Sequence, residues 1–149
     1  MKIDFEKIIN DLNAKANNIY FDKGKIKELL DKTKKKAEGN KGLNSIFNDV
    51  ITALELIKDW MKGDYKNLSK NSIIMIIISF LYLVNPFDII PDFLFGGFID
   101  DAAVIAYIFK KIKSEISSYT EWKIGKEYNN DYKVEIFDVS ESNDKESDN

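Results

Sequence analysis

One run of the sequence limits the possible folds more than any other feature. The segment "SIIMIIISFLYLV", residues 72–84, is apolar on every side of a helix, so it must be buried in protein or in lipid. Asn85-Pro86 ends this helix, because the residue before a proline avoids helical dihedral angles. Another helix, apolar on all sides in its first half, begins near Asp100 and reaches lysines at residues 110–113. The sequence therefore predicts an apolar helical hairpin.

The first helix of this hairpin is too short for a conventional membrane span. Residues 72–84 make a helix of about 20 Å, whereas the core of a bilayer is about 30 Å thick. A longer span would have to include Asp88, and a charged side chain at the middle of a membrane costs roughly 2.5–3.5 kcal/mol. The sequence favours a hairpin covered by protein, and it leaves open a peripheral protein that dips the hairpin into a membrane.

Three amphipathic helices precede the hairpin and are suited to cover it. Apolar residues recur at helical spacing over residues 5–20, 26–37 and 43–61, and each helix needs an apolar surface on which to bury this face. Asp4 is placed to cap the first helix, and Gly63 is placed to end the third. The predicted fold class is all-α with about five helices, in which the N-terminal amphipathic helices cover a central apolar helical hairpin.

The chain has the length of one domain. We expect a single helical domain over residues 1–122, with the hairpin module at residues 69–109. Residues 123–149 are expected to form a mostly disordered acidic tail, because the final segment "DVSESNDKESDN" is polar and acidic. A short strand over "DYKVEIFDV", residues 131–139, has no partner strand in the sequence to support it.

The residue types that are missing exclude most familiar catalytic sites. The sequence contains no Cys, His or Arg. Disulfides, thiolate metal sites, Ser/His/Asp triads and guanidinium clamps on phosphate are therefore excluded. A site built from carboxylates alone, holding Mg²⁺, Mn²⁺ or Ca²⁺, stays possible. This composition favours a protein that is not an enzyme.

The charge of the chain is divided unevenly along its length. Residues 1–70 hold 15 Lys against 11 acidic residues, whereas residues 71–149 hold 7 Lys against 14. The run "KTKKK", residues 32–36, could touch a phosphate surface, but a solvated helix face near a terminus is the better explanation. No direct nucleic-acid binding is expected, because the chain is not basic as a whole. The N-terminus does not resemble a signal peptide, so a cytoplasmic location, peripheral to the membrane at most, is expected.

Asp88, Asp92, Asp100 and Asp101 lie in the most apolar part of the chain, and no Lys lies between Lys70 and Lys110. The hairpin places these carboxylates at its tip. Three of them, Asp88, Asp100 and Asp101, stand where helix caps or first-turn acids are favoured. Alternatively, the four carboxylates converge on a hard cation such as Mg²⁺, Mn²⁺ or Ca²⁺. Both interpretations stay open.

The segment "NPFDIIPDFLFGGFIDDAAVI", residues 85–105, resembles the signature of the YkvA-like bacterial family of unknown function. The positions that match the family pattern are Pro86, Asp88, Pro91, Asp92, Gly97, Asp100 and Asp101. The resemblance implies a small helical protein, often membrane-associated, without an established activity. It also implies that the aspartates form a recurring site, and Asn85 departs from the pattern, where Ser is usual.

Three functions follow from these observations. The first is a non-enzymatic helical interaction or scaffold module, cytoplasmic or peripherally membrane-associated, with a protein partner. The second is a divalent-metal-dependent hydrolase that acts on a phosphate or lipid head group, with Asp88, Asp92, Asp100 and Asp101 as ligands. The third is a small inhibitor whose acidic surface occupies the basic channel of a nucleic-acid-binding protein. Neither the oligomeric state nor the partner follows from the sequence.

Overall fold

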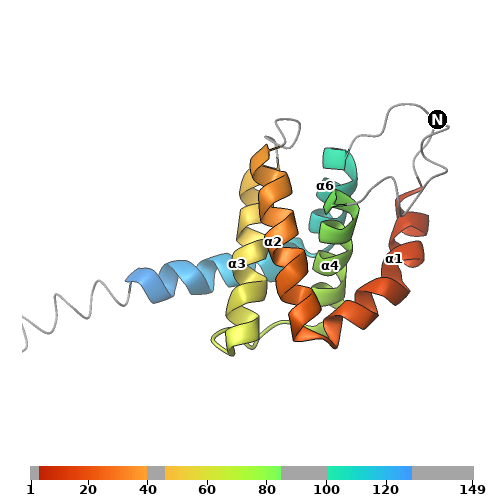
Figure 1. Ribbon diagram of the computed structural model, residues 1–149. Helices are drawn as coiled ribbons and strands as arrows, with labels where there is room; N and C mark the ends of the chain where they lie inside the picture. The colour runs from red at the N-terminus through yellow and green to blue at the C-terminus, as the bar shows by residue number, and fades with distance from the viewer. Residues whose placement is uncertain (1–3, 40–45, 85–100, 129–149) are drawn as a thin grey trace, which may run out of the picture. The chain divides into compact units, whose positions relative to one another are not determined.

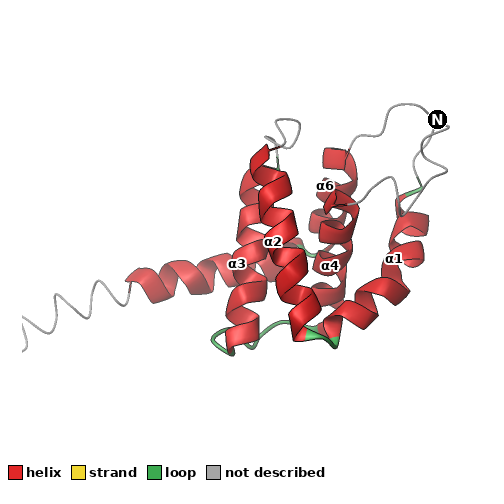
Figure 2. Cartoon of the chain, viewed as in Figure 1, coloured by secondary structure: helices red, strands yellow, loops and turns green. Residues whose placement is uncertain are grey.

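The computed structural model describes residues 4–39, 46–84 and 101–128. These residues divide between two compact units, residues 1–116 and residues 117–149. Within the described ranges all regular structure is helical and no strand occurs (Figure 2), which confirms the all-α fold class. The proposed short strand and most of the expected acidic tail fall at residues 129–149, outside the described residues.

The described residues of the first unit form five named helices (Figure 1). In chain order they are α1 (Phe5–Tyr20), α2 (Lys23–Gly39), α3 (Phe47–Lys62), α4 (Lys70–Val84) and α6 (Asp101–Lys111). Residues 113–128 are helical as well, and residues 117–128 of this stretch belong to the second unit. The helix count therefore agrees with the expectation of about five.

The centre of the first unit is α4, the helix formed by the apolar run. It packs against α1, α2 and α6, and every residue from Ser72 to Leu83 is buried. The buried hydroxyl of Ser79 donates to the carbonyl oxygen of Ile76 at 2.6 Å, so it is not left unpaired in the core. The run is thus covered by protein, as the sequence favoured. No helix among the described residues is long and apolar enough to cross a membrane.

The helices begin and end where local chemistry predicts. The carboxylate of Asp4 accepts from the backbone N–H of Lys7 at 3.0 Å and caps α1, as expected. Gly63 ends α3 in the left-handed conformation, with φ of 82°. The backbone N–H groups of Asp64 and Tyr65 then bond to the carbonyl oxygen of Asp59 at 3.0 and 3.2 Å. The last carbonyls of α3 are satisfied by this turn.

The last predicted helix is interrupted where the sequence gives no signal. The helix predicted from near Asp100 ends at a turn at Ile112, which separates α6 from the helical residues 113–128. The carbonyl oxygen of Ile112 accepts from the N–H groups of both Glu115 and Ile116 at 3.1 Å. No Gly or Pro marks this position. Helical structure continues past Trp122 to residue 128.

Candidate functional site

The aspartates predicted to form a cation site cannot be placed. Asp88, Asp92 and Asp100 lie outside the described residues, and only the backbone of Asp101, the first residue of α6, is described. Within the parts of the chain that are described, no group of three or more Asp or Glu side chains could hold a metal ion. The cation site and the hydrolase hypothesis that depends on it stay predictions, as does the inhibitor hypothesis.

A cluster of aromatic side chains and lysines lies where α1 passes into α2 and α3 leads to α4. Both connections are at the same end of the first unit (Figure 1). The rings of Tyr20 and Trp60 stack with centroids 5.6 Å apart, and the ring of Phe21 meets that of Tyr20 edge-on at 4.9 Å. The ammonium of Lys70 lies 4.7 Å from the ring centre of Phe21 and 5.3 Å from that of Tyr20. We call this cluster, with its neighbouring lysines, the aromatic–lysine end.

Phe21 is the most exposed aromatic side chain of this cluster, with 73% of its surface accessible. It occupies a tight turn between two helices. The N–H of Asp22 donates to the carbonyl oxygen of Ile19 at 2.9 Å, and the carboxylate of Asp22 accepts from the N–H of Lys25 at 3.2 Å. Because these bonds fix the turn on both sides of Phe21, the ring is held in water rather than folded back onto the core.

Cations outnumber acids around this ring. The two segments that build the end, residues 20–25 and 60–70, contain five Lys and two Asp. All five lysines are exposed. One of the acids, Asp22, is already engaged as the cap of α2. The aromatic–lysine end therefore combines an exposed apolar ring with a positive surround, which suits an anionic, partly apolar partner surface.

The link from α3 to α4 adds a polar network at the start of α4. The hydroxyl of Ser69 accepts from the N–H of Ser72 at 3.1 Å and so caps the helix; it also lies 3.0 Å from a carboxylate oxygen of Glu115. Burial, and then the charge of Glu115, raise the pKa of the Tyr65 hydroxyl above its ordinary value. These contacts join the start of α4 to the segment after α6.

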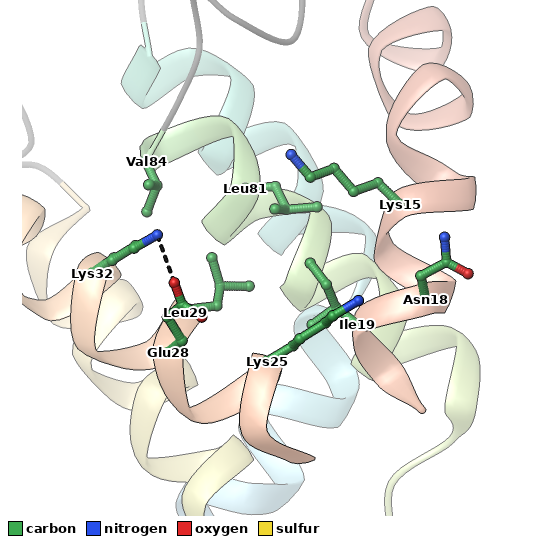
Figure 3. A pocket seen from close by; sticks show the side chains of 9 residues that line it. All are labelled: Lys15, Asn18, Ile19, Lys25, Glu28, Leu29, Lys32, Leu81 and Val84. Atoms are coloured by element: carbon green, nitrogen blue, oxygen red, sulfur yellow. Dashed lines mark ion pairs between the residues drawn. The ribbon is translucent and has the colours of Figure 1, made fainter. Parts of the chain in front are cut away.

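A pocket of about 310 Å³ opens between α1, α2 and α4. Its floor is aliphatic and its rim carries lysines (Figure 3). The floor residues are Ile19, Leu29, Leu81 and Val84, and the rim residues are Lys15, Asn18, Lys25, Glu28 and Lys32. The sequence showed neither feature of the first unit, because each one assembles residues from helices that are far apart along the chain.

By its fold, this is an all-α protein in which amphipathic helices cover an apolar helical hairpin. The sequence that connects the two helices of the hairpin is rich in Asp and Pro. Residues 72–107 match the family model "Protein of unknown function (DUF1232)". "Uncharacterized membrane protein YkvA" of Bacillus subtilis (strain 168) is 38% identical over 85 residues, which cover 56% of this chain and 80% of that protein. The chain therefore belongs to the YkvA-like family of unknown function, as its motif indicated. No solved structure matches it.

Proposed function

We propose that the protein is a non-enzymatic helical module that attaches peripherally to an anionic membrane through its aromatic–lysine end. The observation that carries the proposal is Phe21, 73% exposed at a fixed turn, with the ammonium of Lys70 4.7 Å from its ring centre. Aromatic rings favour the boundary between lipid and water, and lysines favour anionic head groups. The proposed location is the cytoplasmic side of the membrane.

The energetics suit reversible attachment. Removing a Phe side chain from water contributes about 1.5–3 kcal/mol, and each Lys near an anionic surface contributes about 1 kcal/mol. One ring and five lysines, opposed by two aspartates, are enough for binding that salt weakens. A spanning helix is not needed for such binding, and the relative from Bacillus subtilis carries the name of a membrane protein.

The module would bind other molecules through its surfaces rather than catalyse a reaction. With no His, Cys or Arg in the sequence, the thiol nucleophile, the usual neutral-pH base and the guanidinium clamp on phosphate are missing. Attachment at one end of the first unit would leave its other helical surfaces exposed to the cytoplasm. We therefore propose that the module acts as a scaffold that holds a protein partner at the membrane.

Sedimentation with vesicles tests the proposal. Full-length protein is mixed with vesicles of phosphatidylcholine, alone or with phosphatidylglycerol, at low and at physiological salt. We expect binding that requires phosphatidylglycerol and falls with salt. Phe21→Ser should weaken binding about tenfold, because the apolar contribution is lost. Tyr128→Ser is the matched control, since it removes another exposed aromatic ring, 65% accessible, from the second unit.

A pair of charge variants locates the contact surface. Lys62→Gln/Lys66→Gln/Lys70→Gln removes three charges from the aromatic–lysine end, and it should abolish most of the binding. Lys34→Gln/Lys35→Gln/Lys36→Gln removes the same charge from exposed positions of α2, and it should bind like the unaltered protein. The proposal is wrong if the second variant loses binding and the first does not, or if Phe21→Ser has no effect.

A further inference from the structure

We propose that the pocket between α1, α2 and α4 binds a single-chain anionic lipid, with the alkyl chain on the aliphatic floor and the carboxylate or phosphate head on the lysine rim. This proposal does not rest on attachment to a membrane. Lys25 is the one residue that the pocket shares with the aromatic–lysine end; the other lining residues lie outside that end, and the ligand of the pocket is a single molecule rather than a surface.

The floor of the pocket is suited to an alkyl chain. Leu29 and Ile19 keep only 6% and 8% of their surface accessible, and Leu81 keeps 5%. Val84, at the end of α4, is half-buried. Their side chains come from three different helices and converge on the same space (Figure 3). A volume of about 310 Å³ lies at the lower end of the range for small-molecule pockets.

The rim of the pocket carries a net positive charge. Three lysines and one glutamate line it. Glu28 and Lys32 form an ion pair of 2.9 Å, which neutralises one lysine (Figure 3). Lys15 and Lys25 make no ion pair with any described residue. Two cationic charges are therefore left above an apolar floor, and they favour an anionic head group.

The aliphatic floor and the lysine rim together favour an amphiphile over a ligand that is only anionic or only apolar. A free inorganic anion would use the lysines, but it would leave the aliphatic floor in contact with water. A neutral alkyl alcohol would use the floor, but it would leave the lysines without a counter-charge. Lysine ammonium groups bind carboxylate and phosphate alike, because each ammonium acts as a mobile point charge rather than as a planar fork. The head group is therefore defined by its charge.

Calorimetric titration of the full-length protein with decyl ligands tests the inference. Decanoate and decyl phosphate, each kept below its micelle concentration, supply the two head groups; decanol and inorganic phosphate are the controls. We expect saturable binding of both decyl anions, at least about tenfold weaker binding of decanol, and no binding of inorganic phosphate. Binding of only one decyl anion supports the inference and identifies the head group. If neither binds, or if decanol or inorganic phosphate binds equally well, the inference is wrong.

Two variants connect the binding to the pocket. Lys15→Gln/Lys25→Gln should weaken decyl phosphate about tenfold or more. Lys7→Gln/Lys35→Gln is matched to it, since it removes one exposed lysine from α1 and one from α2 outside the pocket, and it should leave the affinity unchanged. Equal loss in both variants would show general charge attraction and overturn the inference. No vesicles are present, so this result is independent of membrane attachment.

Discussion

Glu6 shows how single side chains fasten the first helix to the last helix of the hairpin. Its carboxylate accepts from the hydroxyl of Tyr107 at 2.6 Å, and it forms an ion pair with the ammonium of Lys111. The neighbouring ring of Phe5 stacks on Tyr107 with centroids 4.5 Å apart. The bond from Lys111 and then the bond from Tyr107 hold the pKa of Glu6 below its ordinary value of 4.5.

The lowered pKa of Glu6 predicts a pH-dependent stability. A carboxylate whose folded pKa is depressed stabilises the fold fully above its unfolded pKa, and this contribution is lost as the pH falls through the folded value. Glu6→Gln should therefore lower the urea midpoint at neutral pH. The difference from the unaltered protein should shrink as the pH falls below 4.5 and vanish below the lowered pKa of folded Glu6. Glu55→Gln, at an exposed position of α3, should show no such dependence. A Glu6→Gln loss that persists in acid would contradict the ion-pair explanation.

Ser69 is the residue on which the start of α4 depends. Replacing its capping hydroxyl in Ser69→Ala should destabilise the protein by about 1 kcal/mol, measured by urea unfolding. Ser69→Thr keeps a hydroxyl at the same atom and should recover most of the loss. If the two variants are equally unstable, the bond between the hydroxyl and the Ser72 N–H, 3.1 Å long, is not what stabilises the helix start.

A melting experiment distinguishes the two interpretations of the four aspartates. The cation-site interpretation predicts that Mg²⁺, Mn²⁺ or Ca²⁺ raises Tm by several degrees relative to chelator, and that Asp100→Asn/Asp101→Asn abolishes the rise. The capping interpretation predicts no rise with any of these ions, and a lower Tm for the variant in every buffer. The comparison with chelator decides between them.

At the scale of the helix, the end of α3 depends on a backbone conformation that only glycine adopts freely. Gly63 has φ of 82°, and no atom lies within 4 Å of a Cβ built there. Gly63→Ala should therefore cost about 1 kcal/mol through backbone strain alone. Gly39→Ala is the control, because its Cβ would also meet nothing within 4 Å and its φ is not positive. Equal unfolding midpoints for the two variants would contradict this explanation.

The helices differ in how far the sequence could predict them. Burial of α4 was predictable because a helix that is apolar on every side has no face for water. The turn at Ile112 was not, because apolar residues keep helical spacing across it and neither Gly nor Pro interrupts them. The bonds from Glu115 and Ile116 to one carbonyl oxygen belong to the three-dimensional structure and leave no pattern in the sequence.

The two candidate binding features could not be predicted from the sequence, for a related reason. Tyr20 was counted among the apolar residues of its helix, but its ring stacks on Trp60 and lies near Lys70, which belong to other helices. No motif or spacing in the sequence sets Lys15 and Lys25 apart from the other lysines. They gain a shared role only because α1 and α2 bring them to one pocket. Such pairings depend on tertiary packing, which helical periodicity does not encode.

For the whole molecule, the proposed membrane attachment depends on the covering of α4. The apolar surface that would favour lipid is used inside the first unit, against α1, α2 and α6. Among the described residues of the first unit, Phe21 is the large apolar side chain that stays exposed, and lysines lie beside it. We therefore expect attachment without unfolding of the helices, at the end where α1 meets α2.

The most direct test of this claim uses the fluorescence of Trp60 in a Trp122→Phe variant, which leaves a single tryptophan. The protein is mixed with vesicles that contain phosphatidylglycerol and lipids brominated near the head group. We expect quenching of Trp60, because its ring stacks on Tyr20 beside the inserted Phe21, and unchanged helical circular dichroism. Bound protein whose Trp60 is not quenched, while Trp122 is quenched in a Trp60→Phe variant, would contradict the account.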